Sequence, residues 1–286
     1  MKIKEVIDEI LETVTPLKRK GTQAMHFIYL KEIRHAIGNR ALSAFNRKDF
    51  MQWIGKLKLT KKRKTFDDYS KFINIIFNYA YQQRMCRFLT KFPKVDTAIK
   101  KTGRVYTNEE LNLLWKHMNG PMKLQFILAL EMFMRLREAL YLKWDRVDLQ
   151  RRVINLRAED VKTGSKTGKG RCIPISENAY NILIELKASG AHPVWVFPNP
   201  SGGGPINNNR RAWRTAKKRS QVTGRARWHD LRHTALTLAI GEHKVPAAHL
   251  CLVAGLSIRT LERVYLHPQV DHLRSVTEQI NVLKIA

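Results

Sequence analysis

The 286-residue chain is short of acidic side chains: 24 Asp and Glu stand against 52 Lys and Arg, a formal net charge of +28 at pH 7. This excess is larger than solubility requires and indicates a polyanionic partner, with nucleic acid as the leading candidate. Residues 1–105 carry 24 basic and 9 acidic side chains, and residues 106–286 carry 28 and 15. The even division favours two folded lobes that face one polyanion; a generally basic surface, as on many ribosomal proteins, is the alternative.

Other absences narrow the class of protein. No apolar run reaches the roughly 18 residues of a membrane span, and the N-terminal stretch contains acids, unlike a signal peptide. We therefore expect a cytoplasmic, nucleoid-associated protein without a membrane partner. Three scattered cysteines form neither a disulfide framework nor a metal motif. No DxD, HxH or HExxH spacing occurs, and the glycine run 202–204 lacks the Lys-Ser/Thr of a Walker loop. We expect no metal and no bound nucleotide.

Residues 1–92 are predicted to form an all-helical DNA-binding lobe, because apolar residues recur at helical spacing and no alternating stretch is long enough for a strand. Residues 93–106 contain Pro93, several lysines and Gly103 without apolar periodicity, which is typical of a linker. The sequence Thr107-Asn-Glu-Glu is a capping box that starts a new helix. A flexible basic linker would let two basic lobes close around a duplex.

A basic cluster precedes the helix that is predicted to carry residues 69–81. Cations at a helix N-terminus can contact phosphate, although such a run is often only a solvated loop. The candidate DNA-binding residues are Lys61, Lys62, Arg63 and Lys64.

The second lobe, residues 107–286, mixes helices with a little strand. One long helix is predicted from 121 to 142, and short strands are predicted at 152–157 and 171–175, joined by a turn rich in lysine and glycine. The expected fold class is mainly α with a small antiparallel β-sheet. Further helices are expected to begin near residues 176, 206, 228, 245 and 258.

Arg135 interrupts an apolar helical seam in the segment 121–142. Positions 128, 132, 135, 139 and 142 follow the spacing of one helical face, and the other four are apolar or small. A buried guanidinium is costly unless an anion meets it. Arg135 is therefore either a structural partner of Glu138 or a phosphate ligand that Glu138 orients.

His229 and Arg232 are three residues apart, which places both on one helical face near an N-terminus that favours phosphate. The neighbouring His233 points away from that face and is expected to be structural. In the turn 161–170, three lysines could deliver an ammonium group as a proton donor to a leaving oxygen, or could simply be solvated. These are Lys162, Lys166 and Lys169.

Tyr265 is the candidate nucleophile. A phenol has a free pKa of about 10, so it attacks only where cations and a base lower the cost of the phenolate. Two arginines that hold the non-bridging oxygens of a phosphate would supply the dominant electrostatic stabilisation of the transition state. In isolation, such a tyrosine is more often a core or interface residue.

Together these residues resemble the tyrosine recombinase, or phage integrase, family over nearly the whole chain. The segment from Ala129 to Trp144 looks like the family's first arginine motif, with Glu138 at its acidic position. The segment His229-Asp-Leu-Arg-His-Thr looks like the second box. The family places a proline eight residues after its catalytic lysine, a spacing that Lys166 fits and Lys162 does not.

The resemblance implies that Tyr265 attacks a scissile phosphate to give a 3′-phosphotyrosine and a free 5′-hydroxyl, with Lys166 as the acid for the leaving oxygen. Arg135, His229 and Arg232 complete the catalytic set. The bond energy is kept in the covalent intermediate, so neither ATP nor metal is required. A site-specific recombinase for phage or mobile-element integration and excision is the leading hypothesis. A Xer-like dimer resolvase, a type IB topoisomerase and a catalytically weakened DNA-binding relative are the alternatives.

The resemblance also implies an assembly. Residues 1–92 would be a helical core-binding (SAM-like) domain, and residues 107–286 the catalytic domain. The partners would be double-stranded DNA and three further copies, in a homotetramer on two core sites, and accessory DNA-bending factors are left open. The helical lobe starts almost at Met1, so no additional arm-binding domain is expected before it. A tail helix at 272–286 would pack on a neighbouring subunit, or alternatively on its own core.

Leu256 departs from the family pattern. The family usually has His or Trp at this position, nine residues before the tyrosine, and the spacing to Tyr265 is kept here. Leucine cannot donate a hydrogen bond to phosphate, and one such donor contributes on the order of 2–4 kcal/mol to transition-state stabilisation. The sequence therefore predicts reduced but real activity.

Overall fold

The computed structural model describes residues 1–57, 63–93, 103–161, 164–190 and 192–264. It divides into two compact units, Met1–Lys100 and Lys101–Ala286, so the division falls inside the segment predicted as a linker. No helix in these ranges is long and apolar enough to cross a membrane.

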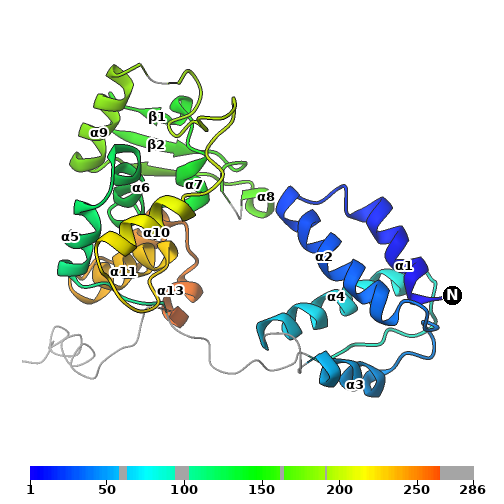
Figure 1. The fold of residues 1–286 in the computed structure, drawn as a ribbon. Helices are drawn as coiled ribbons and strands as arrows, with labels where there is room; N and C mark the ends of the chain where they lie inside the picture. The colour runs from blue at the N-terminus through cyan, green and yellow to red at the C-terminus, as the bar shows by residue number, and fades with distance from the viewer. Residues whose placement is uncertain (58–62, 94–102, 162–163, 191, 265–286) are drawn as a thin grey trace, which may run out of the picture. The chain divides into compact units, whose positions relative to one another are not determined.

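The first unit is built from helices, coloured blue to cyan in Figure 1. Its core is one cluster rich in aromatic side chains, among them Tyr29, Phe50, Tyr69 and Phe72. Tyr29 and Phe72 stack with ring centroids 4.9 Å apart. The predicted helical character is confirmed for the described part of this unit. Its elements are α1 (Ile3–Glu9), the π-helical turn η1 (Ile10–Val14), α2 (Lys20–Ile37), α3 (Arg47–Leu57) and α4 (Arg63–Gln82).

Part of the predicted basic cluster lies at the start of α4. Arg63 and Lys64 are the first two residues of this helix. Lys61 and Lys62 lie outside the described residues, so their proposed contact with DNA stays a prediction.

The second unit combines many short helices with one small sheet, which confirms the predicted fold class. The strands β1 (Val147–Asp148), β2 (Val153–Leu156) and β3 (Arg171–Pro174) pair antiparallel in the order β1-β2-β3. Its helices are α5 (Asn108–Lys116), α6 (Gly120–Leu130), α7 (Leu136–Leu140), the 3-10 turn η2 (Trp144–Arg146), α8 (Gly164–Thr167), α9 (Glu177–Ala188), α10 (Arg210–Arg219), α11 (Trp228–Gly241), α12 (Ala247–Ala254) and α13 (Ile258–Val264).

The sheet and α6 form the centre of the second unit. Ile154 and Ile173 face each other across β2 and β3 and are fully buried, in a core that also contains Leu124 and Leu128 of α6 and Leu183 of α9. Figure 1 shows α9 against the sheet, with α10 and α11 at the opposite end of this unit. The first strand, β1, was not predicted, because its two residues are too short to give a pattern.

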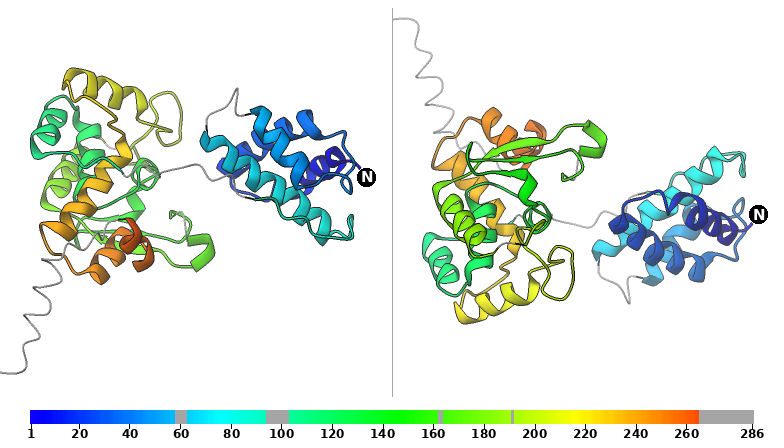
Figure 2. Two further views of the ribbon diagram at one scale, coloured as in Figure 1. Left: turned by 90° about the horizontal axis from the view of Figure 1, so that it is seen from below. Right: turned by 90° about the horizontal axis from the view of Figure 1, so that it is seen from above.

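The β2–β3 connection projects from the body of the second unit in both views of Figure 2. The sequence predicts an open turn from 161 to 170, but the structure forms the single helical turn α8 within it. The catalytic candidate Lys166 belongs to this turn, and its side chain lies outside the described part of the chain.

The predicted long helix from 121 to 142 is wrong. Helix α6 ends at Leu130, and α7 starts only at Leu136. Between them Phe133 adopts a left-handed backbone with φ of 51°, and Met134 N–H donates to the carbonyl oxygen of Leu128 at 2.8 Å. The apolar spacing continues through the break, so the pattern gave no sign of it. Arg135 therefore does not lie in a helical seam: it is the N-cap residue of α7.

The remaining helix starts are close to those predicted. α9 is capped by the side chain of Ser176, and α13 begins at Ile258. The helix expected near Ile206 starts only at Arg210, because Ile206 N–H donates to the carbonyl oxygen of Phe197 in an extended pairing. The helix expected near residue 245 starts at Ala247, after Pro246.

Candidate active site

An ion pair fixes the start of α11. Arg227 is the N-cap residue; its backbone N–H donates to Asp230 Oδ2 at 3.0 Å, and its guanidinium pairs with Asp230 Oδ1 at 2.7 Å. This reciprocal capping places the next residues in the first turn, where backbone N–H groups have no helical acceptors. His229 lies there with an exposed side chain, and Arg232 lies three residues further, buried.

Arg232 joins two distant backbone segments. Its residue is 3% exposed, Nη1 donates to the carbonyl oxygen of Phe133, and Nη2 donates to the carbonyl oxygen of Ala254 at 2.7 Å. A buried guanidinium needs such acceptors, because an uncompensated charge away from water is costly. The side chain thus holds the break between α6 and α7 against the end of α12.

Arg135 reaches the same place from α7. Its Nη2 donates to the carbonyl oxygen of Gly255 at 2.8 Å, next along the chain to the acceptor of Arg232. The last carbonyl groups of a helix have no helical donors and carry a partial negative charge. They can therefore compensate two cations at once. We call Arg135, Arg232 and the carbonyl groups of Ala254 and Gly255 the arginine corner.

Glu138 is the acidic member of this region, as the sequence predicts. Its Oε2 accepts the backbone N–H of Arg135 at 2.8 Å, and its Oε1 accepts Nη1 of Arg135 at 2.9 Å. A second arginine, Arg171 of β3, donates Nη2 to Oε2 at 2.7 Å and Nη1 to Oε1 at 3.2 Å. The sequence interpretation missed Arg171, because a single arginine in a short strand carries no spacing signal.

The pKa values of His229 and Glu138 are both lowered in this region. Desolvation by the surrounding protein, and next the positive charge of Arg232, lower the pKa of His229, while Asp230 opposes this. The imidazole is therefore neutral near pH 7 and can both donate and accept a hydrogen bond. Burial raises the pKa of Glu138, but the hydrogen bonds and charges of Arg171 and Arg135 outweigh it and leave that pKa below its usual range.

Two further predicted residues, Leu256 and Tyr265, and the predicted tail helix follow α12 in the sequence. Leu256 is half-buried beside Leu250 and Leu261, and its backbone N–H donates to the carbonyl oxygen of Cys251 at 3.1 Å. Helix α13 ends at Val264, one residue before the candidate nucleophile. Tyr265 and the predicted tail helix at 272–286 lie outside the described residues, so the structure gives no geometry for them.

His233 has the structural surroundings that its place in the sequence suggests. A Cβ atom built on Gly103 would lie 2.6 Å from two carbon atoms of the His233 ring. One residue further on α11, Thr234 Oγ1 accepts the backbone N–H of Tyr106 at 3.0 Å. Through both contacts, the segment that contains Gly103 and Tyr106 packs against α11.

Helix α10 carries a basic surface that the sequence interpretation did not single out. It contains six arginines and lysines in ten residues and no acid. Trp213 and Ala216 are buried, whereas Arg214 and Lys218, four residues apart, are exposed on one face. A count of charge per helix would have identified it.

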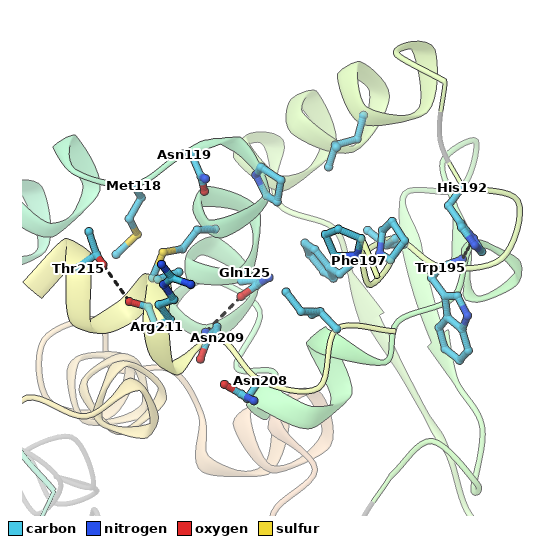
Figure 3. Close-up of a pocket in the computed structure, with 18 of the residues that line it drawn as sticks. Met118, Asn119, Gln125, His192, Trp195, Phe197, Asn208, Asn209, Arg211 and Thr215 are labelled. Atoms are coloured by element: carbon cyan, nitrogen blue, oxygen red, sulfur yellow. Dashed lines mark hydrogen bonds between the residues drawn. The ribbon is translucent and has the colours of Figure 1, made fainter. Parts of the chain in front are cut away.

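A cavity of about 950 Å³ opens beside α10 and the start of α6. In Figure 3 the side chain of Asn209 donates to Oε1 of Gln125 at 3.2 Å, with Phe197 and Trp195 further along the wall. No residue of the arginine corner lines it. Within the described ranges, no group of three or more His, Cys, Asp or Glu side chains is arranged to hold a metal ion.

Comparisons with known proteins identify the family of the chain. The model of the phage integrase family matches residues 104–272. The integrase of Salmonella phage P22 is 28% identical over 213 residues, which are 70% of this chain and 53% of that relative. The chain therefore spans about half the length of this relative.

Solved structures share the fold at low identity. The integrase of transposon Tn1549, in complex with transposon right-end DNA, has a TM-score of 0.76 at 18% identity and covers 99% of this chain and 100% of its own. Lambda integrase in a tetramer bound to a Holliday junction has a TM-score of 0.72 at 13% identity, over 90% and 78% of the two chains. The family match covers more than half of the chain and confirms the resemblance drawn from its motifs: the chain belongs to the phage integrase family.

Proposed function

We propose that the protein is a site-specific DNA recombinase that cleaves and rejoins strands through a 3′-phosphotyrosine at Tyr265. The observation that carries the proposal is the arginine corner, in which Arg135 and Arg232 bind consecutive carbonyl groups. His229 lies close enough for both cations to lower its pKa. Two guanidinium groups beside a neutral imidazole form a donor set that suits the non-bridging oxygens of a phosphodiester. The names of the relatives, integrases of phage P22 and Tn1549, point the same way.

Each residue has a role in this reaction. Tyr265 loses its phenol proton to solvent as its oxygen forms a bond to phosphorus, and the bond from phosphorus to the 5′ oxygen breaks. Lys166 gives that oxygen a proton, so a 5′-hydroxyl leaves. Arg135 and Arg232 stabilise the charge of the five-coordinate transition state, and His229 donates a hydrogen bond to the phosphate. Rejoining reverses these steps, so the phosphodiester is restored without ATP.

Helix α13 would bring Tyr265 to the arginine corner. The helix starts after Ser257, whose hydroxyl accepts the backbone N–H of Thr260 at 3.3 Å, and Leu261 anchors it in the core with no exposed surface. In the chain, Gly255, whose carbonyl group accepts Arg135, therefore lies between Arg232 and the helix that leads to Tyr265. This chain order supports the assignment of the tyrosine.

The proposed partner is double-stranded DNA, held by both units. Residues 1–92 would be the core-binding domain and residues 107–286 the catalytic domain. The lambda integrase structure holds a tetramer on a Holliday junction, and we propose the same number of subunits here, on two core sites. Accessory DNA-bending factors would assist assembly. Cation clusters at the start of α4 and along α10 support DNA contact by each unit.

The test uses a suicide substrate, a duplex core site with a nick just beyond the scissile phosphate, from which the short 5′-hydroxyl fragment diffuses away. An SDS-resistant adduct whose tryptic phosphopeptide contains Tyr265 is the expected result. Absence of any adduct on DNA that the protein binds would leave only a DNA-binding role. Exchange between two duplexes supports a recombinase, whereas relaxation of supercoils without exchange would indicate a topoisomerase.

Replacing Leu256 with histidine should speed cleavage. Because the leucine supplies no donor, L256H should recover part of the missing stabilisation and raise the rate of adduct formation at least about tenfold, which corresponds to about 1.4 kcal/mol. The matched control is L256A, which removes the same packing without adding a donor and should not accelerate cleavage. A folded L256H protein that cleaves no faster than the unaltered chain would contradict this account.

Neutralising the exposed face of α10 should reduce the salt dependence of DNA binding. If Arg214 and Lys218 each contact a phosphate, the double variant R214Q/K218Q should lower the slope of log affinity against log salt by about 1.8, since each contact contributes about 0.9. Arg151 and Lys187 are exposed cations elsewhere in the unit, so R151Q/K187Q is the matched control. Equal slopes for the two double variants would remove α10 from the interface.

A further inference from the structure

Arg171 is a buried cation at the start of β3 that no motif of the sequence identifies. Its side chain is 8% exposed, that of Glu138 is 3% exposed, and two hydrogen bonds of 2.7 and 3.2 Å join them. Resting on the proposed function, we infer that Arg171 is a positioning residue: it holds Glu138 from the sheet, and Glu138 in turn fixes the guanidinium of Arg135 at the arginine corner.

Within the described part of the chain, Glu138 bridges the two arginines. The carboxylate binds the backbone N–H and Nη1 of Arg135 on one side and both terminal nitrogens of Arg171 on the other. Nη2 of Arg135 is then directed to Gly255. A buried carboxylate that binds one guanidinium can rotate together with it. A carboxylate that binds two guanidinium groups on opposite sides cannot rotate with either of them. Arg171 thus removes a freedom that Arg135 would otherwise keep.

Arg171 also packs closely against Gly255, the glycine of the arginine corner. A Cβ atom built on Gly255 would lie 2.6 Å from Nη1 of Arg171, and Gly255 has a φ of 62°. The glycine is therefore required both for its left-handed backbone and for the close approach of the guanidinium. Through this contact β3 meets the end of α12, where the carbonyl groups accept Arg135 and Arg232. One side chain connects the β2–β3 hairpin, α7 and α12.

Stability alone is a weak reason for this arrangement. Replacing a buried ion pair by apolar groups of similar volume is often neutral or stabilising, whereas removing one partner leaves an uncompensated charge. Two guanidinium groups, one buried and one half-buried, around one buried carboxylate are better explained by the need to orient a side chain that will meet phosphate. Displacing a catalytic group by about 1 Å can cost about 10²-fold in rate.

Removing Arg171 changes the titration of Glu138 in a defined direction. In the described part of the chain, Glu138 faces Arg135 from the start of α7 and Arg171 from β3. Arg171 is the larger cause of its lowered pKa. Without it, the pKa of Glu138 rises, so the carboxylate is protonated, and its hold on Arg135 lost, at a higher pH than in the unaltered chain.

The experiment compares R171M, R171K and the unaltered chain in single-turnover cleavage of the suicide substrate at saturating protein, over a range of pH. R171M should reduce the rate of adduct formation by up to about 10²-fold with unchanged DNA affinity, and should shift the acid limb of the pH profile upward. R171K should recover part of the rate, because an ammonium group still pairs with one carboxylate oxygen. The matched control is Arg152, also in the sheet region, which pairs with Glu177 at an exposed site; R152M should cleave normally.

The outcomes distinguish the proposed recombinase function from the positioning role of Arg171. No adduct with the unaltered chain would remove the proposed function, and this role with it. An adduct from the unaltered chain together with full activity of R171M at every pH would overturn the role of Arg171 alone. A loss of rate with an unmoved acid limb and no rescue by R171K would also overturn it, because that is the result of a merely structural defect. If R171M does not fold, R171Q, which also removes the charge but keeps a polar side chain, carries the same pH test.

Discussion

Tyr265→Phe should abolish the covalent adduct while DNA binding is retained. The change removes one oxygen and keeps the ring, but the chain loses the only atom that the proposed mechanism bonds to phosphorus. Loss of a catalytic nucleophile costs at least about 10⁴-fold in rate, which is below detection in a suicide-substrate assay. The measurement is the fraction of DNA in SDS-resistant adduct, with affinity measured by a mobility shift.

The control for this prediction is a second tyrosine with a hydroxyl contact of its own. Tyr141 donates to Oδ1 of Asn207 at 3.3 Å and has no part in the proposed mechanism, so Tyr141→Phe should form adduct at the normal rate. An adduct that persists in Tyr265→Phe would show that another side chain is the nucleophile, and the assignment of Tyr265 made from the family resemblance would be wrong. Loss of DNA binding in Tyr265→Phe would mean that the residue has a structural task instead.

Local signals in the sequence were sufficient where capping side chains define an element. The capping box at Thr107 is formed as predicted, with its hydroxyl accepting the backbone N–H of Glu110. Ser176 caps α9, and α11 begins at Trp228. In each case the residues that satisfy the free N–H groups lie within four positions of the helix start, so a reader of the sequence can see them.

The break between α6 and α7 could not be predicted in that way. No glycine or proline lies between residues 131 and 135, and the apolar spacing runs through without interruption. The carbonyl group of Phe133 is instead bound by Arg232, 99 residues further along the chain. The break is therefore a tertiary contact, and it moves Arg135 from a helical seam to an N-cap. The chemistry assigned to Arg135 does not depend on that error, because Glu138 is three residues away in either case.

Arg171 and Gly255 were invisible for a related reason. Arg171 lies 33 residues from Glu138, and Gly255 lies in a segment noted only for the leucine that follows it. Neither has a periodicity or a local partner. Their significance comes from the approach of β3 to α12, which only the fold provides. Motif spacing thus supplied Glu138 and the residues proposed to touch phosphate, and the structure supplied Arg171 and Gly255, which hold them in place.

Arg232→Lys should reduce cleavage by about 10²–10³-fold, or about 2.7–4 kcal/mol of transition-state stabilisation. Lysine keeps the positive charge but offers a single nitrogen, which cannot take both positions from which Nη1 and Nη2 reach the carbonyl groups of Phe133 and Ala254. The expected loss is in the rate of adduct formation at saturating protein, with DNA affinity little changed, because most affinity comes from phosphate contacts elsewhere on the duplex.

Arg227→Lys is the matched control, since Arg227 is also an arginine at the start of α11 and is bound there to Asp230. A lysine can still pair with that carboxylate at a half-exposed site, so the expected loss of rate is small. Equal losses of rate in the two variants would show that any lysine at the start of α11 disturbs the helix. That result would contradict a specific role of Arg232 in the transition state. A large loss of rate in Arg232→Lys alone, at an unchanged melting temperature, means that the guanidinium stabilises the transition state itself. The backbone contacts that hold Arg232 then orient this group toward the scissile phosphate.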